Sequence, residues 1–516
     1  MNFTEPAISD REDRQDVPTV ASGSGRVRRH ANSGTAGIWT WPDVILVASL
    51  VVIGFVLRSI GVGWESIWYD EACSLKMASA SFHDLITGAA LDIGNPCGYF
   101  ILLKLWCSVF GYTIESARIF SAVADVMSIV ITWVFAMTIC RDRRIAVTAV
   151  VMVTINPAMI FLAREARVFG LLTALVTTVA WLTEKILRDG RRRYWVALTA
   201  CSIVLPHLHY YTLFVLTVLW IPLVFGRKDE RLSRFVQYVG MGLISLLCFL
   251  PWSPNFLLQL TLWTAPFNPW MKHAAYFPVY TLAGRTGIWK QDGLMMMLLA
   301  QVVVLGGVYL PALLSIKSVF RIIRVPALIA IGVMSLALFV SVVYDSLLNC
   351  RYLSPVIPCI IIAWSVAIWH LPQRLKMLRW CSIALVCLIA MGSLGRMYAR
   401  NHKHDWRGVA AMISHRAADS PVVFYEDIGE ESFHYYRAGH ATRRVPERFG
   451  NAGEGWNESG LESELQQMGD FWFCLWTLDD WEAIETWMED RFDRIDAADF
   501  GEIQVRRYQV KPTTVP

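Results

Sequence analysis

Two adjacent acids, Asp70 and Glu71, are the residues of this chain whose type and placement most clearly indicate chemistry. They lie in Trp68-Tyr69-Asp70-Glu71, shortly after the first membrane-length apolar run at 38–58. At about 1.5 Å per residue such a run crosses a hydrocarbon core of about 30 Å. Ionisable groups placed where a chain leaves the bilayer are costly in a half-dry site, so they usually carry a function. The alternative is a solvated acidic loop or a structural ion pair.

The elements that must position these acids are apolar segments that recur along most of the chain. Of the 516 residues, 55% are hydrophobic, which excludes an ordinary soluble enzyme. We expect about eleven membrane spans, and each is a run of mostly apolar residues. They are 38–58, 117–139, 145–162, 168–187, 194–206, 211–226, 235–251, 293–315, 326–344, 353–370 and 379–396.

The arginines and lysines between these runs predict the orientation. Basic clusters at 141–144, 185–193, 227–234, 317–324 and 374–379 should all face the cytoplasm. The apolar run 97–112 is only about 16 residues long and contains Lys104, so it is interpreted as an interfacial helix and not as a span. The N-terminus is then cytoplasmic, and the acids lie outside. The chain is expected in the cytoplasmic (inner) membrane as a multi-pass protein.

We predict an all-α polytopic membrane protein with a small α/β extracytoplasmic domain at its C-terminus. The expected parts are a disordered cytoplasmic tail (1–37), a transmembrane domain (38–396) with its first outer loop at 59–116, and a soluble domain (397–516). In the soluble domain the predicted strands are 421–425, 471–476 and 503–510, and the predicted helices are 405–417, 461–468 and 479–491. The tryptophan-rich loop 252–292 is interpreted as an aromatic belt that lies on the bilayer.

At the outer face the residues resemble a known family. After the acid pair come Asn95-Pro96-Cys97-Gly98-Tyr99, Arg164-Glu165-Ala166-Arg167, Arg351-Tyr352-Leu353-Ser354-Pro355 and Asp405-Trp406-Arg407. This order is similar to that of the GT-C membrane glycosyltransferases, the broad group of protein O-mannosyltransferases and bacterial lipid A aminoarabinose and galacturonic acid transferases. The resemblance covers most of residues 38–425. It implies an inverting transfer of a sugar from a polyprenyl-phosphate donor to a lipid or glycan acceptor.

The resemblance also implies roles for single residues. Asp70 is the candidate base that takes the acceptor proton. Glu71 is the alternative base, or it orients the base or binds a divalent cation, Mg²⁺ or Mn²⁺. Glu165 stands where relatives place a second acid. Arginines offer a fork for the leaving phosphate, and the candidates are Arg351, Arg164 and Arg167. Substrate contacts are expected from Tyr69, Asn95, Tyr99, His209 and Tyr352.

Other interpretations of these residues stay open at this point. Arg351 could snorkel to the interface or pair with Asp345, Glu165 could belong to a local ion-pair cluster, and His209 could be an interface residue. The competing function is a polytopic lipid or glycan transporter or flippase. Transporters tend to carry ionisable groups near the middle of their spans, whereas here Asp125 is the one acid well inside a span. We expect the bilayer and lipid substrates as partners, and no nucleic acid.

Overall fold

The structure is a computed structural model of the chain. It describes residues 39–92, 94–225, 231–262, 270–284, 293–344, 347–400, 403–425, 429–445, 458–476 and 481–511. The predicted tail 1–37 and Asp345 lie outside these residues.

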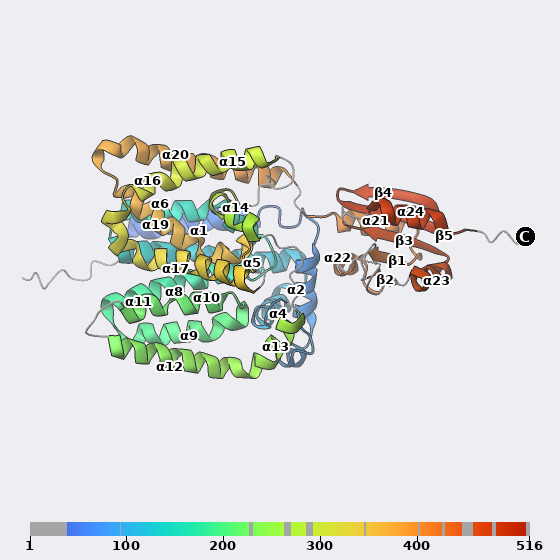
Figure 1. The fold of residues 1–516 in the computed structure, drawn as a ribbon, viewed down its shortest axis with the longest axis horizontal. Coiled ribbons are helices and arrows are strands. Elements are labelled where there is room, and N and C mark those ends of the chain that lie inside the picture. The colour runs from blue at the N-terminus through green and yellow to red at the C-terminus, as the bar shows by residue number, and fades with distance from the viewer. Residues whose placement is uncertain are drawn as a thin grey trace, which may run out of the picture.

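Helices that run side by side form the larger part of the molecule, and a separate sheet domain lies beyond one end of them (Figure 1). The helices are α1 (Trp41–Ser59), α2 (Tyr69–Ser79), α3 (Phe82–Thr87), α4 (Gly98–Phe110), α5 (Ile114–Cys140), α6 (Arg143–Thr154), α7 (Pro157–Ala163), α8 (Phe169–Asp189), α9 (Arg192–Leu208), α10 (Thr212–Val218), α11 (Trp220–Phe225), α12 (Arg231–Phe249), α13 (Ser253–Leu262), α14 (Trp270–Ala283), α15 (Gly293–Val304), α16 (Leu310–Leu313), α17 (Ile316–Val343), α18 (Cys350–Leu353), α19 (Ile357–Trp369) and α20 (Lys376–Ala399). Short turns of other helix types join α12 to α13, α15 to α16, α18 to α19, and α19 to α20.

The membrane-spanning character of this bundle is clear, although the number of spans is not the predicted one. Within the described residues seven helices are long and apolar enough to cross a membrane, or eight if the bent pair α6–α7 is one span. The other predicted spans fall on shorter apolar helices, Thr212–Val224 and Leu298–Leu313 among them, and on the 17-residue α9. The predicted count of eleven is therefore not confirmed, while each predicted apolar run is mostly helical where the structure describes it.

The bend between α6 and α7 has a local cause that matters for the site. Pro157 lacks a backbone N–H and disfavours helix at the residue before it, so the α6 ladder stops at Thr154 and the chain turns by 48°. Asn156 then caps α7, because its Oδ1 accepts a hydrogen bond from the Met159 amide at 3.0 Å. The short α7 ends at Ala163, which leaves residues 164–168 as the turn that carries Glu165.

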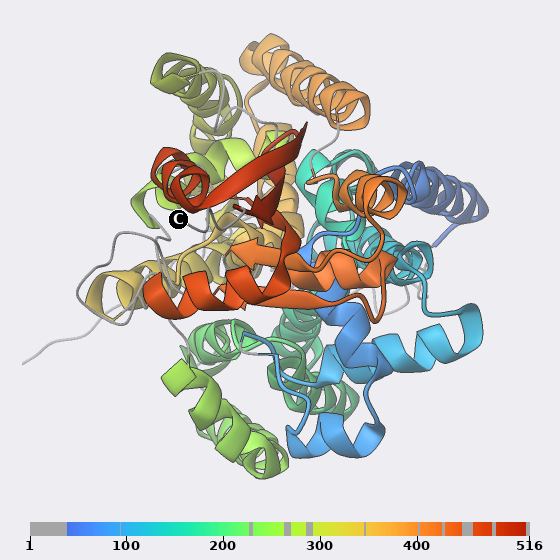
Figure 2. The same cartoon turned by 90° about the vertical axis from the view of Figure 1, so that its right-hand side faces the viewer.

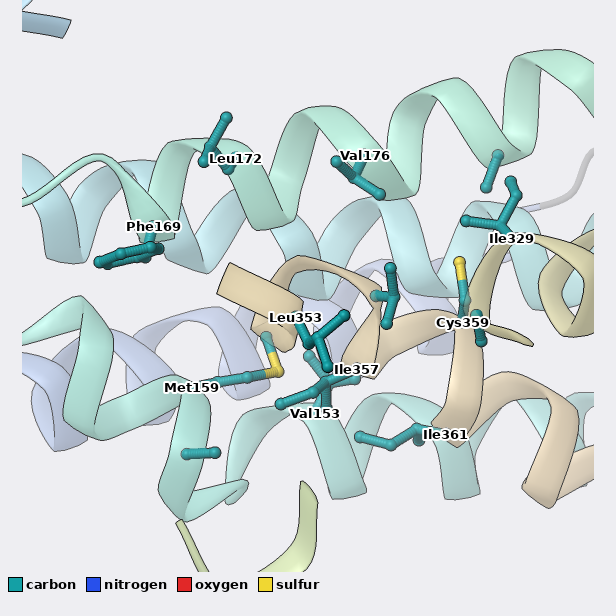
Figure 3. Close-up of a cluster of buried hydrophobic side chains, with 14 of the residues drawn as sticks. Val153, Met159, Phe169, Leu172, Val176, Ile329, Leu353, Ile357, Cys359 and Ile361 are labelled. Atoms are coloured by element: carbon teal, nitrogen blue, oxygen red, sulfur yellow. The ribbon is translucent and has the colours of Figure 1, made fainter. Parts of the chain in front are cut away.

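The bundle core extends through most of its helices, and the part that bears on this turn lies between α8 and the α18–α19 segment. Phe169, Leu172 and Val176 of α8 pack in one cluster with Leu353 and Ile357 (Figure 3). All five side chains are almost fully buried. This packing fixes the position of α18 relative to α8, and with it the position of Arg351.

The segments α2, α3 and α4 lie together at the end of the bundle that faces the sheet domain (Figures 1 and 2). With 13 residues, α4 is too short to span, which agrees with the interfacial helix expected at 97–112. The interpretation of 252–292 as a surface belt is wrong for its described part. The helix α12 continues into α13 up to Leu262, and α14 is packed inside the bundle, with Tyr276 and Tyr280 buried.

The C-terminal domain has helices on both faces of a five-stranded sheet with strand order β2-β1-β3-β5-β4. The strands are β1 (Val422–Tyr425), β2 (Thr442–Val445), β3 (Asp470–Leu475), β4 (Phe492–Phe500) and β5 (Ile503–Val510), and the helices are α21 (Trp406–Arg416), α22 (Glu430–Tyr436), α23 (Glu458–Met468) and α24 (Trp481–Arg491). β1 is parallel to β2 and β3, and β5 is antiparallel to β3 and β4. Along β3 the side chains alternate, so Phe473 joins the core under α23 and α24 while Trp472 joins the core under α21 and α22.

The sequence missed β2, β4 and α22. Both missed strands lie at the edges of the sheet and are rich in charge, with Arg443 and Arg444 in one and Asp493 and Arg494 in the other. Charged residues are common on edge strands because they prevent edge-to-edge association. Because of these charges, the two strands lack the alternation of apolar and polar residues from which a strand is predicted.

One ion pair lies inside the membrane part and ties three spans together. Arg58 at the end of α1 donates from Nε to Asp125 Oδ2 of α5 at 2.6 Å, and its Nη1 donates to the Thr154 carbonyl at 3.2 Å. The exposed fractions of the Arg58 and Asp125 side chains are 0% and 1%. The intramembrane acid is thus neutralised by a fixed, fully enclosed partner, which is the environment of a structural pair and not of a transport path.

We predict that Asp125→Asn destabilises the protein by about 3–5 kcal/mol, because it leaves a buried guanidinium without its counter-charge. Thermal unfolding in detergent measures the loss. The double variant Arg58→Met/Asp125→Leu should recover much of it, since no unpaired charge remains. Asp142→Asn, which retains an acceptor for the Arg144 amide at the start of α6, serves as the control. An unfolding temperature of Asp125→Asn equal to that of the control would contradict the structural role.

Candidate active site

The two acids of the first outer loop lie in the first turn of α2. Successive residues of an α-helix point about 100° apart, so Asp70 and Glu71 must enter different surroundings. The structure separates them clearly: the Glu71 side chain is fully buried, while the Asp70 side chain is 27% exposed.

Glu71 is held by groups from three distant parts of the chain. Arg118 at the start of α5 donates from Nε to Oε1 at 2.9 Å and from Nη2 to Oε2 at 2.7 Å. The Ala166 amide donates to Oε1 at 3.0 Å, and the Lys403 ammonium lies 2.9 Å from the same oxygen. Burial alone raises the pKa of Glu71, but Lys403 and Arg118 lower it to about 2. These contacts make Glu71 a fixed anion that anchors α2.

Asp70 points to the other side of α2, toward two arginines. Its Oδ2 accepts a hydrogen bond from Arg351 Nη1 at 3.1 Å, and its backbone carbonyl accepts one from Arg167 Nη1 at 3.0 Å. Desolvation raises the pKa of Asp70, but the positive charges of Arg167 and Arg351 outweigh it and hold the pKa below its ordinary value. Asp70 is therefore an ionised carboxylate with part of its surface accessible.

Arg351 bridges the two outer-face acids. While Nη1 binds Asp70, Nη2 donates to Glu165 Oε2 at 2.8 Å. The guanidinium lies over the ring of Trp68, with 4.9 Å to the centroid, and over the ring of Phe169, with 5.2 Å. Its Nε is buried without a hydrogen-bond partner in the described part of the chain. A buried donor of this kind is rare unless a ligand or water uses it.

Glu165 reaches Arg351 from the turn after α7 and is only 2% exposed. Desolvation raises the pKa of Glu165 despite the nearby Arg351 and Lys403 charges. Its Oε1 is a second buried polar atom of this site without a hydrogen-bond partner among the described residues. The pKa values of Asp70 and Glu165 are thus pushed in opposite directions, a pattern typical of acid and base pairs in active sites.

Arg167 occupies the space between α2 and a further acid, Asp92. It donates to the Ser74 hydroxyl at 3.2 Å, and its Nη1 lies 3.9 Å from Asp92 Oδ2. The other oxygen of Asp92 accepts hydrogen bonds from the Gly94 amide and from the side chain of Asn95, each at 2.9 Å. Sequence reasoning missed Asp92, although an aspartate two residues before a glycine is a common turn signal that marks a fixed acid.

His209 faces the same two arginines as a neutral imidazole. The Tyr211 amide donates to its Nδ1 at 3.1 Å, so the proton of the neutral ring is on Nε2. Desolvation lowers the pKa of His209, and the charges of Arg167 and Arg351 lower it further, to about 3. The ring packs against Tyr352, with 5.1 Å between centroids. His209 and Tyr352 thus lie together near the arginine pair, and their predicted contacts with substrate stay a prediction.

The remaining predicted residues lie outside this group or serve its frame. Arg164 donates to the carbonyls of Ile60 and Gly61 after α1, and its guanidinium lies over the Tyr398 ring at 5.0 Å. Tyr99 is buried, and its hydroxyl lies 3.3 Å from the Ser121 hydroxyl. Tyr69 lies beside Cys73. The predicted phosphate role of Arg164 and the predicted substrate role of Tyr99 therefore have no support from their positions.

The acid pair does not offer the ligand set of a metal site. Within the described residues no group of three histidine, cysteine or acidic side chains is close enough to hold an ion. Asp70 and Glu71 are each paired with guanidinium groups and point apart. The predicted divalent cation remains a prediction.

An apolar cavity of about 330 Å³ opens beside the bundle between α14, α16, α17 and α19. Its walls include Phe277, Ala327, Met334 and Trp364. Phe277 lies one helical turn from Tyr280, whose buried hydroxyl has no hydrogen-bond partner in the described residues. The helix α14 also packs against α18, which carries Arg351. The cavity and the polar site thus share α14.

Comparisons with known proteins agree with the architecture. Residues 95–254 match the family model for dolichyl-phosphate-mannose-protein mannosyltransferase. The fold resembles the crystal structure of ArnT from Cupriavidus metallidurans in the apo state, with 16% identity, a TM-score of 0.57, and coverage of 90% of this chain and 97% of that one. The same protein bound to undecaprenyl phosphate gives 13% identity, a TM-score of 0.53 and the same coverage. No curated protein sequence matches the chain. These matches agree with the resemblance stated from the sequence: the fold is that of the ArnT structures, and the matched segment is that of the mannosyltransferase family model.

Replacing Glu71 by glutamine should destabilise the protein by about 3–5 kcal/mol, because Arg118 and Lys403 would then be buried without a counter-charge. Thermal unfolding in detergent is the measurement. Glu115→Gln, a change near the exposed start of α5, is the control and should have almost no effect. A Glu71→Gln protein as stable as the control would show that the carboxylate charge does not anchor α2.

The neutral state of His209 predicts a pH-dependent stability. Its pKa is about 3 in the folded chain against 6.5 for a free histidine, so between these values the unfolded chain binds the extra proton. Stability should therefore fall as the pH drops below 6.5, by about 2 kcal/mol at pH 5. Unfolding temperatures of wild type and His209→Gln at pH 7 and pH 5 measure this contribution. Equal losses in both proteins would exclude His209 as the source.

Proposed function

We propose that this GT-C superfamily membrane protein transfers a sugar from a polyprenyl-phosphate donor to an acceptor hydroxyl, with inversion at the anomeric carbon. The observation that supports it most directly is the Arg351 guanidinium, which binds Asp70 and Glu165 at once at the end of a GT-C bundle. It places a carboxylate able to take a proton next to cations able to receive a phosphate. The acceptor is a lipid or a glycan.

Asp70 is the proposed base. Its pKa is lowered by Arg167 and Arg351 in spite of desolvation, so it is ionised at neutral pH and free to accept a proton. Its partial exposure lets an acceptor hydroxyl approach, whereas Glu71 is enclosed by four hydrogen-bonding or ionic contacts. Glu71 therefore orients the base and does not replace it.

The leaving group is a polyprenyl phosphate, which needs donors and positive charge as the bond to the sugar breaks. Arg351 and Arg167 supply the charge, and the Nε2–H of His209 supplies a neutral donor on the same side. A phosphate bound to Arg351 competes with Asp70 for Nη1, which releases the carboxylate for the acceptor. Glu165 holds the other Nη group of Arg351 and so keeps the guanidinium in place during this exchange.

We propose that the apolar cavity between α14, α16, α17 and α19 receives part of the prenyl chain of the donor. Its lining is almost entirely aliphatic and aromatic, as a hydrocarbon chain requires. Undecaprenyl phosphate is the ligand named for one of the structures that this fold resembles. The shared helix α14 gives a short path from the cavity to the arginines.

We further propose that the reaction takes place at the outer face of the cytoplasmic membrane, with the N-terminus inside and the C-terminal domain outside. The basic connection between α19 and α20 lies at the end of the bundle away from α2 and the sheet domain (Figure 1). The connection carries Arg374, and the first turn of α20 carries Lys376 and Arg379; these basic residues favour the cytoplasm. The site at the opposite end then faces outward.

Loss of the base should abolish transfer. We predict that Asp70→Asn lowers kcat about 10²- to 10⁴-fold, because the amide cannot take the acceptor proton. Membranes with wild type or variant are incubated with radiolabelled undecaprenyl-phosphate sugars, and the labelled product is quantified. Asp84→Asn, a change of an acid in the same loop that is 45% exposed, is the matched control and should keep full activity. Full activity of Asp70→Asn would remove this residue as the base, and no transfer by wild type would favour a transporter.

A further inference from the structure

Lys403 connects the C-terminal domain to the acid-bearing helix. It lies between α20, the last helix of the bundle, and α21, the first helix of the sheet domain. Its ammonium is 2.9 Å from Glu71 Oε1, and the exposed fractions of the two side chains are 5% and 0%. The two residues are more than 300 positions apart, and the contact ties the segment that enters the domain to α2.

A buried lysine at this place needs its counter-charge. Desolvation lowers the pKa of Lys403, and Glu71, Glu165 and Glu65 oppose that shift while Arg118 adds to it. An ammonium among these groups is a strong local constraint, since moving it away from Glu71 leaves two buried charges incompletely paired. Lys403 therefore resists displacement of the chain segment that enters the domain.

The constraint passes to Asp70 through one peptide unit. Glu71 and Asp70 are neighbours in the first turn of α2, so fixing the Glu71 carboxylate fixes the Asp70 backbone. That backbone carbonyl already accepts a hydrogen bond from Arg167, and the side chain one from Arg351. Catalytic groups need positions accurate to about 0.5 Å, and an error of about 1 Å can cost about 100-fold in rate.

Other contacts of the domain act on the same loop. The Tyr436 hydroxyl of α22 accepts a hydrogen bond from the Ile67 amide at 2.9 Å, just before α2, and the Arg407 amide donates to the Ser66 hydroxyl at 2.9 Å. The Tyr435 hydroxyl accepts one from the Ile114 amide at 3.0 Å, at the start of α5. Figure 2 shows the sheet domain in front of the helix ends, with the blue α2–α4 segment beside it. The domain thus holds the entry to α2 as well as its first turn.

We propose that Lys403 is a positioning residue that acts through Glu71 on Asp70, so that the C-terminal domain is a working part of the active site and not a passive module. The catalytic part of this inference rests on the proposed function. The mechanical part, that Lys403 holds α2, stands on the contacts alone.

The test compares three full-length variants. Lys403→Met removes the charge while leaving Arg118 and the Ala166 amide on Glu71, Lys403→Arg keeps the charge, and Lys76→Met is the control. Lys76 pairs with Glu431 across the same domain boundary, but its side chain is 64% exposed, so its loss should matter little. For each protein, kcat and the donor KM are measured, and hydrogen exchange is recorded for peptides that cover residues 69–79.

We expect Lys403→Met to lower kcat about 10- to 100-fold with a smaller change in the donor KM, and to raise amide exchange in α2 about tenfold. Lys403→Arg should recover most of both, and Lys76→Met should match wild type. If Lys403→Met does not fold in detergent, Lys403→Gln takes its place.

Two results would overturn the inference. One is a wild-type kcat together with wild-type exchange in α2 for the uncharged variant. The other is an equal effect of Lys76→Met, which would assign the loss to domain docking in general. If wild type itself transfers no sugar from any prenyl-linked donor, the proposed function fails, while the exchange data still decide whether Lys403 holds α2.

Discussion

The candidate site depends on the ionic and hydrogen-bonding contacts of the buried Glu71 carboxylate. It is fully buried, and it is neutralised by Arg118 from α5, the Ala166 amide from the turn after α7, and Lys403 from the entry to the C-terminal domain. Such a group is expensive to bury without partners and very costly to unpair once buried. Its partners come from the bundle, a turn and the linker that enters the sheet domain, so a correct Glu71 site requires that all three are in place. Because Asp70 is the adjacent residue in the first turn of α2, the contacts of Glu71 also fix the backbone of Asp70.

The positive and negative charges of the site offset one another only in part. Arg351 shares its guanidinium between Asp70 and Glu165, Arg167 is shared between α2 and Asp92, and His209 stays neutral beside both arginines. Two polar atoms of this group, Arg351 Nε and Glu165 Oε1, are buried without a hydrogen-bond partner among the described residues. Unsatisfied buried donors and acceptors are a cost that proteins accept mainly at functional sites. The unpartnered Arg351 Nε–H is a donor that an anionic ligand can use, and Glu165 Oε1 is an acceptor that a ligand hydroxyl can use, so the arrangement suits a ligand site better than a closed structural network.

Much of this could be predicted from the sequence, because the strongest signals are long-range and simple. Hydropathy and arginine placement brought Asp70, Glu165, Arg167 and Arg351 to one face, and the structure places them in contact. The partners of Glu71 could not be predicted in this way. Lys403 is a single lysine in a polar linker, and Arg118 resembles any arginine at the end of a span. Arg164 is predicted to bind phosphate because it lies in the same short turn as Glu165 and Arg167. In the structure its side chain points back to the carbonyls that follow α1. Side-chain direction in a short turn is set by local geometry, which hydropathy does not encode.

The most direct test of this account is an experimental structure of the full chain with undecaprenyl phosphate. We predict phosphate density within hydrogen-bonding distance of Arg351 and Arg167, with the Asp70 carboxylate released from Arg351 and the Glu71 contacts unchanged. A phosphate bound where neither arginine reaches it, or a Glu71 carboxylate that has left Arg118 and Lys403, would contradict it.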